Sequence, residues 1–250
     1  MTDEEVRVTG TGGDDVIWLR SGRASRGPRP AHSLADIAET GVRVADADGL
    51  DAVSMRRIAA ELGSGTTSLY RYVSSKDDIL DLMYDAVLGE EELPPPRGYW
   101  PDDLAAIAHR MRGLMIRHPW MTALAGRPSV GPNGLYATER ALRAVDGLGL
   151  GIDEMVVLIE ALEAYVLGYV TRELADRAAT RRSGRDWDQW MAAHARYGRT
   201  IIDGGRFPLV ARAWLDAREP HARDRQERGF RHGLERLLDG IGARIRAARG

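Results

Sequence analysis

A run of hydroxyl, aromatic and basic side chains follows a glycine-broken turn in the segment AAELGSGTTSLYRYV, residues 59–73. The run contains, in order, Thr66, Thr67, Ser68, Tyr70, Arg71 and Tyr72. Consecutive helical positions point in different directions, so at least one of the last three side chains must face outward. Hydroxyl groups bind phosphates and base edges, arginine makes paired hydrogen bonds to guanine, and a tyrosine hydroxyl reaches phosphate. These residue types therefore indicate nucleic-acid binding.

The residues around this run have the pattern of a helix-turn-helix motif. Two short helices that cross steeply need a small residue where they approach, which Ala59 provides. The turn needs a residue that tolerates positive φ, which Gly63 provides. Ile58, Leu62 and Leu69 are then expected to face a common core. In this motif the second helix enters the major groove of DNA. The alternative is a helical hairpin inside a bundle, with no role in DNA binding.

The elements that would position these residues are all helices. Helical periodicity recurs along the chain and no alternating strand is convincing, so the expected fold class is all-α. Ser33 with Asp36 resembles a capping box at the start of the first clear helix, which ends near residue 48. The other expected helices span roughly 54–62, 66–72, 75–88, 102–117, 133–146, 152–178, 186–202, 207–217 and 223–247.

Composition divides the chain into four parts. Residues 1–32 are predicted to be a disordered N-terminus followed by a basic arm that carries Arg20, Arg23, Arg26 and Arg29. Residues 33–88 form the expected three-helix, helix-turn-helix domain. Residues 89–100, GEEELPPPRGYW, are a proline-rich linker, and residues 101–250 are a larger helical bundle.

Charge and composition restrict the classes of function that the chain can have. Residues 31–76 hold five Lys/Arg and six Asp/Glu, a net charge of −1, so DNA binding requires basic residues concentrated on one face. The arm would supplement them, by insertion into the minor groove or merely as a solvated linker. The chain has no cysteine, no long apolar run and no secretory signal, which favours a cytoplasmic protein that does not enter a membrane. Its histidines and carboxylates match no catalytic or metal-binding pattern, so an enzyme is not expected.

Two stretches, GLDAVSMRRIAAELG and TTSLYRYVSSKDDILDLM, resemble the N-terminal domain of the tetracycline-repressor (TetR) family of bacterial transcription regulators. The element LYRYV-x-x-K is similar to the LYxHF-x-x-K signature of that family, with Tyr72 where many members have histidine. The resemblance implies DNA contacts from the helix before the turn, from the start of the recognition helix and from phosphate-binding positions. With Arg71, the predicted DNA-binding residues are Met55, Arg56, Thr66, Thr67, Ser68, Tyr70, Tyr72 and Lys76.

The C-terminal part resembles the ligand-binding and dimerisation domain of the tetracycline-repressor subgroup, through HPWMTALAGRP, LYATERALRAVDGLGL and ALEAYVLGYV. The resemblance implies a homodimer on a palindromic duplex operator. Members that bind magnesium-tetracycline carry HLGTRP where this chain reads ALAGRP, so Ala123 replaces the metal-binding histidine. No metal or cofactor is therefore expected.

The expected effector is a small apolar or aromatic molecule that releases a repressor from its operator. Aromatic and methionine side chains with a few polar handles suit such a cavity. The candidate lining residues are Met111, Met115, Trp120, Tyr136, Tyr165, Tyr169, Trp190 and His194. The alternative is a regulator without a small ligand, whose C-terminal domain serves only dimerisation.

Two apolar stripes could form either the dimer interface or the core of one chain. The first stripe is Met155, Leu158, Ile159, Leu162, Val166 and Val170, and the second is Phe230, Leu234, Leu237, Leu238, Ile241 and Ile245. The helix over 75–88 is expected to connect the DNA-binding domain to the bundle, with Met83 and Val87 packed against the bundle.

Overall fold

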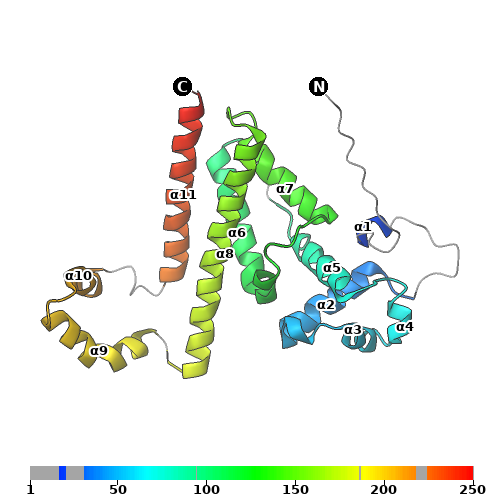
Figure 1. Ribbon diagram of the computed structural model, residues 1–250, viewed down its shortest axis with the longest axis horizontal. Coiled ribbons are helices and arrows are strands. Elements are labelled where there is room, and N and C mark those ends of the chain that lie inside the picture. The colour runs from blue at the N-terminus through cyan, green and yellow to red at the C-terminus, as the bar shows by residue number, and fades with distance from the viewer. Residues whose placement is uncertain (1–16, 21–30, 94, 186, 218–223, 250) are drawn as a thin grey trace. The chain divides into compact units, whose positions relative to one another are not determined.

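The computed structural model describes residues 17–20, 31–93, 95–185, 187–217 and 224–249 (Figure 1). Within these ranges every regular element is a helix, which confirms the all-α prediction. The expected disorder of residues 1–15 and most of the arginine arm lie outside the described residues.

The helices begin and end close to the predicted positions. In chain order they are α1 (Ile17–Arg20), α2 (Leu34–Asp48), the 3-10 helix η1 (Leu50–Ala52), α3 (Met55–Glu61), α4 (Thr66–Leu69), α5 (Lys76–Leu88), α6 (Trp100–Arg117), the 3-10 helix η2 (Pro119–Ala123), α7 (Pro132–Val145), α8 (Ile152–Ser183), α9 (Trp187–Asp203), α10 (Pro208–Asp216) and α11 (Arg225–Arg249). The largest difference is in α8, which continues past the predicted end at residue 178. It stops at Gly184, whose φ of 63° closes the helix in the left-handed conformation.

The chain forms two compact units. The first contains the residues up to Leu93 together with His118–Arg140, and the second contains residues 94–117 and the chain from Ala141 onward. The first of these divisions falls within residues 89–100, and the predicted role of that stretch as a linker stays a prediction. The amino-acid composition did not predict that residues 118–140 group with the N-terminal helices. Helix α7 starts in the first unit and ends in the second.

The first unit is built on the packing of α2 against α5 (Figure 1). Helix α2 starts at a complete capping box, in which Ser33 Oγ accepts from the Asp36 N–H at 3.1 Å and Asp36 accepts from the Ser33 N–H at 2.7 Å. Gly41 lets α5 approach closely, because a Cβ there would lie 2.6 Å from the Met83 Sδ. Met83 therefore packs against α2 in its own unit, which corrects the expectation that it faces the C-terminal bundle.

The second unit is organised around α8, which packs against α6 and α11. The apolar stripe of α8 is buried at Met155, Ile159, Leu162, Val166 and Val170. The stripe of α11 is buried at Phe230, Leu234, Ile241 and Ile245. Most of each stripe is therefore core of a single chain, while Leu158, Leu237 and Leu238 stay half-buried.

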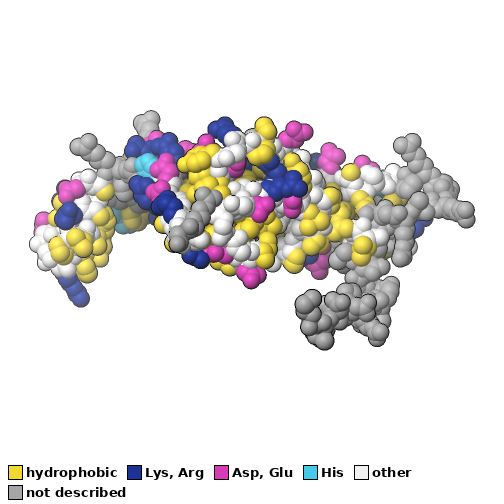
Figure 2. All heavy atoms as spheres, turned by 90° about the horizontal axis from the view of Figure 1, so that it is seen from above, with side chains coloured by type: hydrophobic (Ala, Val, Ile, Leu, Met, Phe, Trp, Pro, Cys, Tyr) yellow, Lys and Arg dark blue, Asp and Glu magenta, His cyan; other side chains and the backbone are white. Residues whose placement is uncertain are grey.

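Helices α9 and α10 pack on each other and expose many apolar side chains, which are yellow at the left of Figure 2. The large exposed ones are Trp190, Tyr197, Phe207, Leu209, Val210, Trp214 and Leu215. Among the described helices, α9 and α10 included, none is long and apolar enough to cross a bilayer.

Candidate nucleic-acid interface and effector site

The α3–turn–α4 segment has the geometry that its sequence predicted. Ser54 caps α3 by accepting from the Arg57 N–H at 3.2 Å. Gly63 adopts a φ of 64°, which a side chain would disfavour, and the chain reverses there into α4. Ile58, Ala59 and Leu69 are buried, which fixes the crossing of the two helices and leaves the start of α4 at the surface.

The predicted DNA-binding residues between Met55 and Lys76 are all exposed or half-buried. Tyr70 is 55% exposed, and Arg56, Thr67 and Arg71 are also exposed. Half-buried positions are taken by Met55, Thr66, Ser68, Tyr72 and Lys76. The ring of Tyr72 meets that of His32 edge-on, with 6.5 Å between the centroids. Lys76 stands at the start of α5, and its Nζ donates to the Leu50 carbonyl at 3.4 Å.

The arginines near the turn differ in whether an acidic side chain of the same unit binds them. Arg43 and Arg57 both bind Glu61, at 3.0 and 2.9 Å, and Arg57 also binds Asp48 at 3.0 Å. The hydrogen bond from Arg43, followed by that from Arg57, holds the pKa of Glu61 below its ordinary value. By contrast, Arg71 has no acidic partner within the described part of the chain. Arg71 is therefore a cation available to a ligand even though the net charge of the region is negative.

Side chains from residues 118–134 hold α5 in the first unit. Arg127 binds Asp77 at 2.8 Å and Asp81 at 2.9 Å, both on α5. Further along α5, buried Asp85 accepts from the backbone N–H groups of Asn133 at 3.0 Å and Gly134 at 2.9 Å, at the start of α7. The sequence analysis did not predict this contact between α5 and the start of α7. The available signal was a carboxylate inside the apolar stripe of a helix.

A buried histidine makes a second set of polar contacts in the first unit, to α2 and to the end of α5. The Nδ1 of His118 lies 2.9 Å from Asp46 on α2, and its Nε2 lies 3.1 Å from Glu90 just after α5. Trp120, a predicted effector residue, donates its indole N–H to Asp46 at 2.8 Å. Trp120 thus supports the first unit, and we leave it out of the proposed effector site. Tyr136 also belongs to the first unit and is exposed.

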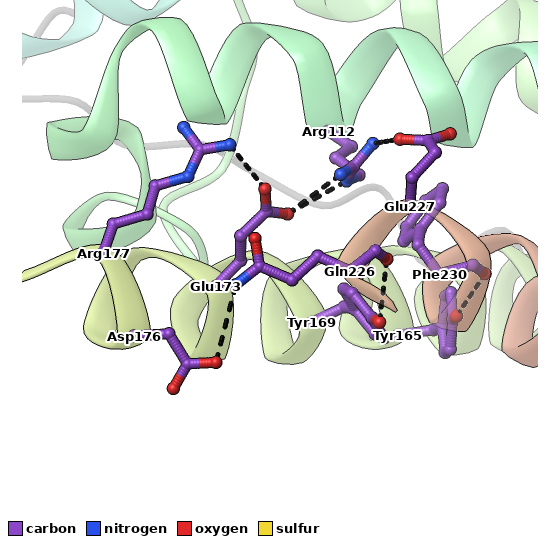
Figure 3. Close-up of polar contacts among 9 residues, drawn as sticks. All are labelled: Arg112, Tyr165, Tyr169, Glu173, Asp176, Arg177, Gln226, Glu227 and Phe230. Atoms are coloured by element: carbon purple, nitrogen blue, oxygen red, sulfur yellow. Dashed lines mark hydrogen bonds and ion pairs between the residues drawn. The ribbon is translucent and has the colours of Figure 1, made fainter. Parts of the chain in front are cut away.

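Four predicted effector residues lie on the packed helices of the second unit. Met115 is buried and Met111 half-buried on α6. Tyr165 and Tyr169 on α8 point at α11, where their hydroxyls donate to the carbonyls of residues 230 and 226 at 2.6 and 2.9 Å (Figure 3). Burial, together with Tyr169, raises the pKa of Tyr165 to about 12, so this hydroxyl stays protonated.

An arginine–glutamate cluster that the sequence analysis did not identify lies beside these tyrosines (Figure 3). Arg112 on α6 binds Glu173 on α8 at 3.0 Å and Glu227 on α11 at 2.5 Å. Glu173 also accepts from Arg177 at 2.6 Å. The cluster joins three helices and places charged groups inside the second unit.

The last two candidate effector residues lie on α9. Trp190 and His194 stack with ring centroids 4.1 Å apart. Trp190 also lines a cleft of about 140 Å³ whose other walls come from the end of α8 and from Arg225. Tyr165 and Tyr169 are not among the residues that line this cleft.

Comparison with known proteins places both units in one family. Residues 37–83 match the domain of the bacterial regulatory proteins of the tetR family, and residues 93–245 match the tetracyclin repressor-like C-terminal domain. The transcriptional repressor DrrR1 of Streptomyces coeruleorubidus is 37% identical over 239 residues, which cover 94% of this chain and 87% of that protein.

Solved structures agree with the sequence relatives. Apo ActR of Streptomyces coelicolor superposes with a TM-score of 0.71 at 28% identity, covering 89% of this chain and 100% of ActR. ActR in complex with actinorhodin gives a TM-score of 0.69 at 27% identity, over 85% of this chain and 96% of that one. The matched families are regulators and not enzymes, as the sequence predicted. The chain therefore belongs to the TetR family of bacterial transcription regulators.

Proposed function

We propose that this protein is a repressor that binds a palindromic operator as a homodimer and leaves it when a small molecule binds the second unit. The observation that carries the DNA-binding part is the capped α3–turn–α4 segment, with Tyr70 and Arg71 exposed and Arg71 without an acidic partner in the described chain. The effector part is supported by ActR, which has been solved with actinorhodin bound. Because its target is chromosomal DNA, we expect the protein in the cytoplasm.

In this proposal α4 and the residues that directly follow it enter the major groove. Arg71 hydrogen-bonds a guanine, Thr67 reaches base edges or phosphates, and the Tyr70 hydroxyl binds a phosphate. One short helix contacts few base pairs. Two copies related by a two-fold axis double the contacts, at half-sites about one helical turn, or a multiple of it, apart.

The dimer is proposed to form through the outer face of α8. The inner face is already used by the core, and the face opposite to it carries small exposed residues at alternating spacings of four and three. This stripe consists of Val157, Ala161, Ala164, Gly168, Thr171 and Ala175. Small side chains let two helices approach closely, and a Cβ at Gly168 would meet no described atom within 4 Å. The face is thus suited to a second copy of α8.

Effector and operator are proposed to communicate through α7 and α5. Helix α7 ends in the second unit, while its first turn is held by Asp85 on α5, and α5 begins at the proposed phosphate ligand Lys76. An effector that favours one orientation of α7 would therefore shift α5. The shift would change the distance between the two helix-turn-helix segments of the dimer. A typical coupling of about 1–3 kcal/mol lowers operator affinity roughly 5- to 150-fold. No metal is needed, since Ala123 offers no ligand atom.

The decisive experiment compares operator binding by single variants. The operator is first located by genome-wide footprinting, and affinities are then measured by fluorescence anisotropy at physiological salt. Arg71→Ala should cost about 1–3 kcal/mol on the operator and less on unrelated duplexes. Tyr70→Phe should weaken all duplexes alike, because only a phosphate contact is lost.

Arg212→Ala is the matched control, because Arg212 is an exposed arginine on α10. Its affinity should equal that of the wild type. Wild-type affinity in both Arg71→Ala and Tyr70→Phe would refute the recognition-helix assignment. If the operator is bound but no small molecule releases it, the second candidate function holds, in which the second unit serves dimerisation only.

A further inference from the structure

The two carboxylates that bind Arg112, which Figure 3 draws on either side of it, differ in burial. The Glu173 side chain is 1% exposed and is held by both Arg112 and Arg177. The Glu227 side chain is 55% exposed and contacts Arg112 from the first turn of α11. A carboxylate that is already largely hydrated leaves an ion pair at little cost, whereas freeing a buried one is expensive. Arg112 therefore has one permanent and one exchangeable partner.

The two partners bind different nitrogens of the Arg112 guanidinium. Nε and Nη2 donate to Glu173 at 3.1 and 3.0 Å, and Nη1 donates to Glu227. Burial by itself lowers the pKa of Arg112, but the hydrogen bond to Glu227 and the charge of Glu173 outweigh it and raise the pKa. Arg112 thus stays charged. When Glu227 turns into water, Arg112 and Arg177 face the single charge of Glu173, and the cluster lacks one anion.

An aromatic cluster centred on Phe230 lies beside the Arg112 guanidinium. The guanidinium carbon lies 4.9 Å from the centroid of the Phe230 ring. That ring packs against Tyr165, Tyr169 and His109, at centroid distances of 5.5, 5.4 and 5.1 Å. Both tyrosine hydroxyls already donate to backbone carbonyls. The guanidinium therefore lies against an aromatic ring, and its Nη1 is the charged group that an acid with an aromatic body can engage from the exposed side of Glu227.

We propose that the effector is an aromatic acid whose carboxylate replaces Glu227 on Nη1 of Arg112. This inference rests on the proposed role of the second unit in effector binding and adds the chemical class. The exchange balances charge, because one carboxylate moves to water as another arrives. It also breaks the contact between α6 and the first turn of α11, so an acid bound there changes how the second unit is held together.

The test uses matched pairs of compounds on the full chain: naphthalene, anthracene and anthraquinone carboxylic acids and their carboxamides. Binding is measured by calorimetry for the wild type, Glu227→Gln and Glu235→Gln. Glu235 is an equally exposed acid on α11 that pairs only weakly with Arg231, at 4.0 Å, so it controls for loss of surface charge.

The acids should bind at least about tenfold more tightly than their amides, since a charged pair is lost in the amides. Glu227→Gln removes the competing charge and should tighten acid binding roughly three- to tenfold, with no change for amides. Glu235→Gln should change neither.

Operator release by the same compounds separates the two proposals. If amides bind and release operator as well as acids, or if Glu227→Gln leaves acid binding unchanged, the aromatic-acid inference is wrong while effector control stands. If no compound of the panel binds, the aromatic-acid inference is wrong, whereas effector control fails only if no small molecule of any class releases the operator.

Discussion

At the scale of single residues, Asp85 acts as a helix cap supplied by a distant element. Helix α7 starts with Pro132, and the next two N–H groups have no partner inside the helix. Asp85 accepts from both, and the Asn133 amide donates to the Asp85 carbonyl at 3.0 Å in return. A carboxylate at a helix N-terminus also interacts favourably with the helix dipole. One side chain therefore fixes the start of α7 to α5.

Removing this cap should destabilise the protein measurably. Asp85→Ala leaves the N–H groups of half-buried Asn133 and buried Gly134 unpaired and should lower the free energy of unfolding by about 1–3 kcal/mol. Asp85→Asn should cost less, because its amide oxygen still accepts one bond. Urea denaturation followed by circular dichroism measures both. Asp239→Ala, an exposed acid on α11 paired with Arg236, is the control and should change stability by under about 0.5 kcal/mol. Equal effects at both sites would contradict the capping role.

At the scale of elements, α8 and α11 pack closely because α11 carries glycines where tyrosine hydroxyls arrive. A Cβ on Gly229 would clash with the hydroxyl of Tyr169, and one on Gly233 would clash with that of Tyr165. These same hydroxyls donate to α11 carbonyls. Close approach and hydrogen bonding thus depend on each other, and they set the separation of the two helices.

Alanine substitutions on α11 should therefore have opposite signs at two positions. Gly240→Ala should stabilise by about 0.5–1 kcal/mol, because alanine is the better helix former and nothing lies within 4 Å. Gly233→Ala should instead destabilise by about 1–3 kcal/mol through overpacking against Tyr165. Thermal unfolding distinguishes the two. The double variant Gly233→Ala/Tyr165→Phe should recover part of the loss, and no recovery would mean that another contact limits the packing.

At the scale of the whole molecule, the proposed dimer brings two DNA-binding domains together through the outer face of α8. Ala164 lies in the middle of the small-residue stripe and is exposed in the single chain. Ala164→Glu should place two charges against each other across the proposed two-fold axis. Sedimentation velocity should then show a monomer, and operator affinity should fall together with dimerisation. Thr138→Glu, on the exposed surface of α7, should remain a dimer; a dimeric Ala164→Glu would exclude this face.

The arginine arm is expected to add affinity more than specificity. Its structure lies outside the described residues, but Ile17 before it is 1% exposed, so deleting the N-terminus would also remove a core residue. Replacing Arg23, Arg26 and Arg29 with glutamine is the cleaner change. Each lost phosphate contact should reduce the slope of log affinity against log salt by about 0.9. An unchanged slope would mean that the arm is only a tether.

The sequence by itself determined the helices and the reading motif, because both depend on local patterns. The capping box at Ser33 and Asp36, the positive φ at Gly63 and the buried spacing of Ile58, Ala59 and Leu69 are all set by residues close together in the chain. Family resemblance extended this to the second unit. Periodicity also identified the apolar stripes of α8 and α11 without showing what covers them.

Only the tertiary structure decided which distant polar groups meet. Asp85 reaches Gly134, His118 lies between Asp46 and Glu90, and Arg112 joins Glu173 and Glu227. Each pairing links separate helices, and helical periodicity records the direction of a side chain but not its partner. The same limit applies to the proposed dimer interface. Periodicity could not show that the apolar face of α8 is covered within its own unit, which leaves the small-residue face exposed for the second copy that we propose.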